Sequence, residues 1–155
     1  MKIPSGAFVI VKEILRHVLR RPVVGIAIVA RAEAGRYLLV RRADTGQWAL
    51  PGGPLEWGER LRPCLVRELR EETNATLAGE PRLVGVYSEP SRDPRFHAVT
   101  VVAECRVSAP SPKAENPVEI RDVRFFAEGE LPAEMAFGMQ DMLDVVREGR
   151  EPHLE

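Results

Sequence analysis

The sequence has few cysteines, no long hydrophobic run and almost no net charge, and each of these features argues against a class of protein. Its two cysteines, Cys64 and Cys105, lack the C-x-x-C spacing of zinc sites and redox motifs. The longest apolar stretch, Val23 to Ala30, has eight residues, whereas a helix needs roughly 20 to span a bilayer. A net charge of −1 gives no general attraction to nucleic acid or to an anionic membrane. We therefore expect a cytoplasmic protein that binds neither.

What the chain does have is the length and composition of one globular domain. It contains 155 residues, of which 45% are hydrophobic and 29% are charged. This is enough apolar material for a proper core. Because the charges nearly balance, any polyanionic ligand would have to be held by local arginines or by metal ions. No internal repeat is present.

Apolar spacing predicts an α/β domain with a mixed β-sheet covered on both faces by helices. Strands are expected over residues 23–31, 37–40, 82–88, 96–107 and 118–126, and helices over residues 60–73 and 135–147. Residues 8–21 have helical spacing but begin with the strand-like FVIV, so either element is expected there. The predicted organisation is an N-terminal extension (1–21), a domain (22–148) and a C-terminal tail (149–155).

The predicted helix 60–73 carries leucine at every fourth position, which is the spacing of an apolar face: Leu61, Leu65 and Leu69. At about 100° per residue, Glu68, Glu71 and Glu72 fall within one arc of roughly 100° beside that face. Two like charges four residues apart, as in Glu68 and Glu72, destabilise a helix by roughly 0.2–0.5 kcal/mol. Sequence features that destabilise a helix locally are commonly found at functional sites. Here a bound divalent cation would be coordinated by the two carboxylates and would remove their repulsion.

The loop before this helix supplies glycines and further carboxylates. Gly52 and Gly53 allow the backbone to approach a ligand closely. Glu56 and Glu59 add oxygen donors. A set of ligands made only of oxygen atoms favours Mg²⁺, or Mn²⁺, over zinc.

The segment GPLEWGERLRPCLVRELREETNA, Gly53 to Ala75, resembles the signature of the Nudix hydrolases. That signature reads Gly, five residues, Glu, seven residues, then Arg-Glu-aliphatic-any-Glu-Glu, any, Gly, aliphatic. Asn74 stands where the family usually has Gly, and Asn can also end a helix in the left-handed region. The resemblance implies an α/β/α sandwich over about residues 22–148 and metal-dependent cleavage of a diphosphate linkage.

The same resemblance assigns roles to residues. It implies that the metal ligands are Glu68, Glu71 and Glu72, with the Gly52 or Gly53 carbonyl and Glu56 as further candidates. Glu59 matches a position that supports the helix by pairing with Arg67. Glu68 or Glu71 is the first candidate for the general base, and a glutamate on a later loop, Glu115 or Glu119, is the competing one.

The stretch Arg92-Asp93-Pro94-Arg95-Phe96-His97 resembles the branch of the family that acts on ADP-ribose and nucleoside-diphosphate sugars. Candidate substrate-binding residues are Arg42, Arg92, Arg95, Trp48 and Glu119, although core packing is the commoner role for an aromatic residue beside a strand. Three functions stay open: a nucleotide-sugar diphosphatase, a nucleoside triphosphate pyrophosphohydrolase and a non-catalytic nucleotide-binding regulator. The sequence also leaves open whether the chain forms a homodimer.

Overall fold

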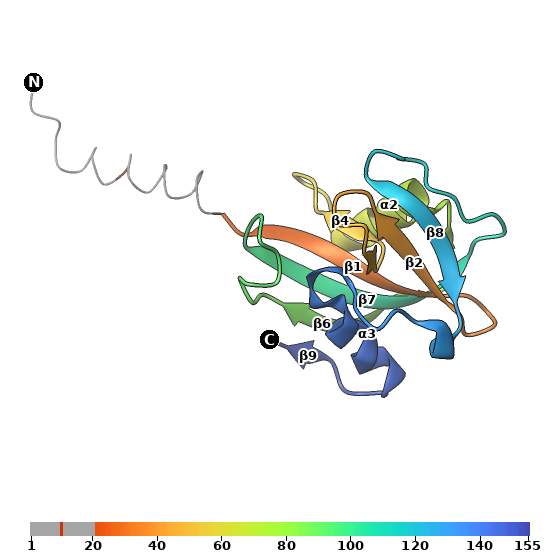
Figure 1. Cartoon of the computed structure of the whole chain (residues 1–155). Coiled ribbons are helices and arrows are strands. Elements are labelled where there is room, and N and C mark those ends of the chain that lie inside the picture. The colour runs from red at the N-terminus through yellow and green to blue at the C-terminus, as the bar shows by residue number, and fades with distance from the viewer. Residues whose placement is uncertain (1–9, 11–20) are drawn as a thin grey trace, which may run out of the picture.

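The computed structural model describes residue 10 and residues 21–155, and it is organised around one mixed β-sheet (Figure 1). The helix or strand expected within residues 8–21 lies almost entirely outside the described residues. In the described part, the strands are β1 (Val23–Arg31), β2 (Tyr37–Arg42), β3 (Trp48–Ala49), β4 (Gly52–Pro54), β5 (Thr76–Leu77), β6 (Arg82–Tyr87), β7 (Ala98–Ser108), β8 (Ile120–Phe126) and β9 (His153–Leu154). The helices are α2 (Leu61–Thr73) and α3 (Met139–Arg147), with short 3-10 turns at Glu128–Glu130 and Ala136–Gly138.

The strand order β3-β2-β1-β7-β6-β9 combines parallel and antiparallel neighbours, with β4, β5 and β8 pairing onto β1, β7 and β2. The central pair is β1 with β7, which run parallel from Val23 opposite Ala98 to Arg31 opposite Arg106. The remaining strands pair antiparallel, except for β9, which runs parallel to β6. This confirms the predicted mixed sheet.

Alternation along β1 divides the core between the two faces of the sheet. Ile26, Ile28 and Ala30 pack on one side with Leu65 and Leu69 of α2. Ala27 and Val29 pack on the other side, in the cluster that holds the buried residues of α3: Met142, Leu143, Val145 and Val146. The helices therefore cover opposite faces (Figure 1), as the α/β/α prediction requires.

Helix α2 occupies almost the range expected from its sequence. Arg60 is its N-cap, in an extended conformation, and Asn74 is its C-cap at φ 56°, ψ 25°. The N–H of Asn74 donates to the Arg70 carbonyl at 3.0 Å, and the N–H of Ala75 reaches the Leu69 carbonyl at 3.4 Å. Asn74 thus ends the helix in the left-handed region, which confirms the expectation for this substitution.

The second predicted helix begins later than its apolar pattern suggested. We predicted residues 135–147, but α3 starts at Met139 because Phe137 (φ 59°) and Gly138 (φ 65°) both adopt left-handed backbone conformations. Likewise, the strand predicted from residue 118 begins at Ile120, after a turn in which the N–H groups of Glu119 and Ile120 donate to the Asn116 carbonyl. In both places a local turn overrides the apolar periodicity.

The segment after α3 returns to the sheet at β9. Gly85 of β6 makes this possible, because a Cβ there would lie 2.5 Å from the His153 carbonyl oxygen. The carboxylate of Glu155 then accepts hydrogen bonds from the N–H groups of Ser88 and Glu89 at 2.7 and 2.6 Å. Within residues 21–155, no helix has both the length and the apolar character needed to cross a membrane.

Candidate functional site

Two glutamates lie on the buried face of α2. Glu68 and Glu72 are only 6% and 8% exposed, whereas Leu61, which we assigned to the apolar face, is 38% exposed. The face that meets the sheet is formed instead by Cys64, Leu65, Glu68, Leu69 and Glu72, together with Thr73. These two acids are therefore part of the contact between helix and sheet, where we had expected them to flank it.

The backbone of β4 receives these carboxylates. The N–H of Gly52 donates to Glu72 Oε2 at 2.8 Å. At Gly53 a Cβ would overlap the carboxylate of Glu68, so a side chain there would displace that carboxylate. Gly52 lies at φ 152°, and a Cβ there would overlap the carbonyl of Ile26. Because Gly52 and Gly53 pair with Ala27 and Ile26 of β1, the segment expected to be a loop is a short strand fixed to the central sheet.

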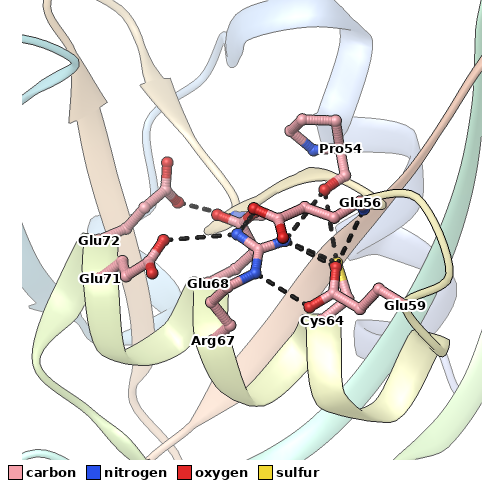
Figure 2. A network of polar contacts seen from close by, with 9 residues as sticks. Pro54, Glu56, Glu59, Cys64, Arg67, Glu68, Glu71 and Glu72 are labelled. Atoms are coloured by element: carbon pink, nitrogen blue, oxygen red, sulfur yellow. Dashed lines mark hydrogen bonds and ion pairs between the residues drawn. The ribbon is translucent and has the colours of Figure 1, made fainter.

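Arg67 is the centre of a polar network on the same helix (Figure 2). Its Nε and Nη2 atoms donate to the two oxygens of Glu59 at 3.0 and 2.9 Å. Nη1 donates to Glu68 Oε1 at 2.7 Å and to Glu71 Oε2 at 3.4 Å. Nη2 also reaches the Pro54 carbonyl at 3.1 Å, so the guanidinium ties the loop before α2 to the helix. Hydrogen bonding to Arg67 lowers the pKa of Glu59 to about 2.

The buried acids show the opposite pKa shift. Burial raises the pKa of Glu68, and Arg67 opposes that rise. Burial also raises the pKa of Glu72 to about 8; the Gly52 N–H opposes this rise, and the charge of Glu68 adds to it. The positive charge of Arg42 lowers the pKa of Glu72 and the negative charge of Glu119 raises it, both less than burial does. The site therefore holds two carboxylates close together at a substantial electrostatic penalty.

The donors present fit a hard divalent cation. The acids of α2 and the backbone of β4 offer only oxygen ligands, and a cation would relieve the repulsion between the buried Glu68 and Glu72. Among residues 21–155, however, no three acidic, histidine or cysteine side chains already converge on one point. One oxygen of each carboxylate is already engaged: Glu68 Oε1 and Glu71 Oε2 accept from Arg67, and Glu72 Oε2 accepts from the Gly52 N–H. Glu56 is exposed, and its N–H donates to Glu59 Oε2 at 3.0 Å.

The two later-loop candidates for the general base lie in different places. Glu115 lines a cavity of about 900 Å³ beside α2, together with Arg67, Glu71 and further residues: Arg62, Pro63, Val66, Arg70 and Asn74. Glu119 instead raises the pKa values of Glu68 and Glu72 through its charge. Glu119 is therefore the candidate whose charge acts on the buried acids, whereas Glu115 lines a cavity with the exposed Glu71.

Arg42 and Arg95 form a second group of charged residues with Asp44 and Asp93. Arg42 binds Asp44 through Nε at 2.9 Å and Nη2 at 2.7 Å. Arg95 binds Asp93 in the same two-pronged way, at 2.9 and 2.7 Å, and also reaches Asp44 Oδ2 at 3.4 Å. Hydrogen bonding to Arg42 lowers the pKa of Asp44 to about 2. The structure thus brings together two of the predicted substrate-binding arginines.

Other predicted substrate-binding residues are engaged elsewhere. Arg92 donates to Glu155 at 2.6 and 2.9 Å, to the Gly138 carbonyl at 3.1 Å and to Asp141 at 3.3 Å, so its contacts tie three segments together. Trp48 packs edge-on against Phe126, with ring centroids 4.8 Å apart, over the core on the α3 side. His97 lies just before β7, with Nε2 2.9 Å from the Ser88 carbonyl oxygen. For Trp48 and Phe126, packing is the observed role.

A comparison with known protein families identifies the domain. The family model described as the NUDIX domain matches residues 19–146. The chain belongs to this family. It is 35% identical over 111 residues to the ADP-ribose pyrophosphatase of Methanocaldococcus jannaschii, a match covering 70% of this chain and 63% of that protein. The chain therefore spans less than two thirds of this relative's length.

Solved structures share the fold. The MutT NUDIX hydrolase of Burkholderia pseudomallei superposes with a TM-score of 0.71 at 27% identity, over 82% of this chain and 99% of that one. The NUDIX domain of Shewanella oneidensis NrtR, solved in complex with ADP ribose, has a TM-score of 0.75 at 20% identity, over 95% of this chain and 99% of that one. At that identity, the second match supports the fold alone.

Three residues that contact Arg42 or Arg95 were not among our candidates. Asp44 and Asp93 were missed because an acid beside an arginine in a turn resembles an ordinary surface ion pair. Phe137 was missed because we assigned it to the closing helix. Its neighbour Gly138 was the available signal, since glycine often marks a break in a helix.

Proposed function

We propose that this NUDIX domain hydrolyses the diphosphate linkage of ADP-ribose or a related nucleoside-diphosphate sugar, giving a nucleoside monophosphate and a sugar phosphate. The observation that carries the proposal is the buried pair Glu68 and Glu72, held against the glycines of β4 at an electrostatic penalty. Such a penalty is expected where a site is kept for a cation.

The substrate class is supported by likeness and by charge. The relative at 35% identity is an ADP-ribose pyrophosphatase. The paired guanidinium groups of Arg42 and Arg95 suit phosphate oxygens, which arginine binds through two parallel N–H donors. Arg92 is proposed to act indirectly, by holding the turn that carries Arg95 against Glu155 and Asp141.

The cation would be held by Glu68, Glu71 and Glu72, with Glu56 and the Gly52 or Gly53 carbonyl as further ligands. Bound there, Mg²⁺ or Mn²⁺ would supply charge neutralisation on the diphosphate and activation of water. Arg67 keeps Glu59 and Glu68 in position, and releases Glu71 most readily because that contact is the longest.

The general base is proposed to be Glu68 or Glu71, with Glu119 and Glu115 as competitors. A base works best when its pKa lies near the working pH, and burial raises the pKa of Glu68 in that direction. Glu119→Gln and Glu115→Gln test the competitors: a large loss of kcat in either one, with Glu68→Gln and Glu71→Gln both still active, would move the assignment.

One experiment tests the function. The protein is incubated with Mg²⁺ and a panel of ADP-ribose, nucleotide sugars, dinucleoside polyphosphates and nucleoside triphosphates, and the products are separated. We expect AMP and ribose 5-phosphate from ADP-ribose. Turnover confined to triphosphates would support the pyrophosphohydrolase alternative, and nucleotide binding without any turnover would support a regulator.

A further inference from the structure

Phe137 holds a backbone conformation that a residue with a side chain seldom adopts. Its φ and ψ are 59° and 24°, in the left-handed region. Such a conformation in a bulky residue is retained only where the surroundings fix it, and it is found disproportionately at ligand sites. The ring is partly buried against the α2-side core, and the following Met139 accepts a hydrogen bond at Sδ from the Leu50 N–H at 3.3 Å. The Phe137 turn therefore adjoins the segment that leads into Gly52.

The Phe137 ring contacts both arginines of the proposed phosphate site. The Cζ atoms of Arg42 and Arg95 each lie 4.9 Å from its centroid. Arg95 also lies over Phe96, at 5.1 Å. An aromatic face attracts a guanidinium through its quadrupole and leaves the N–H groups at the rim of the guanidinium plane free to bind other groups. One aromatic side chain thus contacts the guanidinium groups of an arginine at the end of β2 and an arginine in the β6–β7 turn.

The arginines keep capacity for a ligand. A guanidinium has five N–H donors, and Asp44 and Asp93 take up only part of those on Arg42 and Arg95. The positive charges of Arg42 and Arg95 repel each other, so the two side chains stay together only if they share a partner. Asp44 Oδ2 is one such partner, because it accepts a hydrogen bond from both.

We infer that Phe137 is a positioning residue that holds Arg42 and Arg95 together as a two-guanidinium seat for a phosphate group of the substrate. This inference rests on the proposed function for its choice of substrate. Phe137 itself transfers no proton and coordinates no metal ion. Its strained backbone places the ring where the end of β2 and the β6–β7 turn can both reach it.

The test uses two variants, Phe137→Leu and Phe137→Tyr. Both keep a side chain at this left-handed position, so the backbone strain is the same in each. Leucine keeps the apolar bulk and removes the ring, whereas tyrosine keeps the ring. On the best substrate of the panel, we expect Phe137→Leu to raise KM roughly tenfold, the size that losing a partly desolvated cation–π contact would cause, with kcat changed by less than about threefold. Phe137→Tyr should restore the wild-type KM. An unchanged KM in Phe137→Leu, or an equal rise in Phe137→Tyr, would overturn the inference.

A binding measurement separates this inference from the proposed function. Inorganic pyrophosphate is titrated calorimetrically into the wild type and both variants in excess Mg²⁺. Roughly tenfold weaker binding in Phe137→Leu alone supports the seat, even if no panel member is hydrolysed. Equal affinities, or no pyrophosphate binding to the wild type, would reject it. In a protein that already carries Arg95→Gln, Phe137→Leu should weaken pyrophosphate binding by less than it does in the wild type, because the two residues act as a unit. If the losses of binding free energy in the two single variants simply add in the double variant, this coupling is absent.

Discussion

Glu72 is the residue at which function and stability are most directly opposed. Glu72→Gln keeps an oxygen that can accept the Gly52 N–H, but cannot take on the negative charge that is disfavoured at this buried position beside Glu68. We expect turnover of ADP-ribose in Mg²⁺ to fall by orders of magnitude, while the melting temperature stays the same or rises. The exposed Glu134→Gln is the matched control and should keep full turnover. A marked drop in the melting temperature of Glu72→Gln would mean that this acid serves the fold.

The raised pKa of Glu72 should also make the stability of the metal-free protein depend on pH. Burial raises the Glu72 pKa from 4.5 to about 8, so folding favours its protonated form. Its contribution is therefore fully present below about pH 4.5 and is lost as the pH rises towards 8. In EDTA, urea unfolding should show the wild type losing stability relative to Glu72→Gln across this range. A constant difference between the two proteins would argue against the raised pKa.

At the scale of the element, the C-terminus of α2 depends on a residue that tolerates positive φ. Asn74 lies at φ 56°. We expect Asn74→Ala to lower the free energy of unfolding by about 1 kcal/mol, because a Cβ without a compensating polar group is disfavoured in this region. Asn74→Gly should match the wild type within about 0.5 kcal/mol. Denaturant unfolding measures both, and equal stability of the Ala and Gly variants would be inconsistent with the capping role.

The elements that the sequence predicted well are those with strong local signals. The limits of α2 follow from the leucine spacing and from Asn74, and β1 follows from its run of β-branched residues. Two features could not be read in this way. Gly52 and Gly53 form a strand only because β1 lies beside them, and α3 starts late because Phe137 adopts a left-handed conformation fixed by distant contacts.

At the scale of the whole molecule, Glu155 joins the segment after α3 to the turn that carries Arg92. Its carboxylate accepts from the Ser88 and Glu89 N–H groups and from Arg92, and hydrogen bonding to Arg92 lowers its pKa to about 2. We expect Glu155→Gln to lower the melting temperature by about 2–4 °C at neutral pH. The carboxylate's contribution is present above about pH 4.5 and is lost as the pH falls towards 2. The difference between the two proteins should therefore narrow in acid; a difference that widens would contradict this.

The proposed substrate site is assembled by the tertiary fold as a whole, and this limits what the sequence could predict about it. The acids of α2 share one helix, so their spacing alone indicated a site. Arg42, Asp44, Arg95 and Phe137 come from three separate segments and meet only through the tertiary fold. The sequence identified the two arginines as candidates, but their common partners required the structure.

The parallel pairing of β1 with β7 also has a consequence for how the chain acquires its structure. The two strands are separated by residues 32–97, which include α2 and β6, yet they form the middle of the sheet. Contacts between such distant segments slow folding, because a large loop must close before they form. During synthesis the central pair must wait until residue 108 has emerged, so a nascent chain that ends before β7 should remain open to proteolysis.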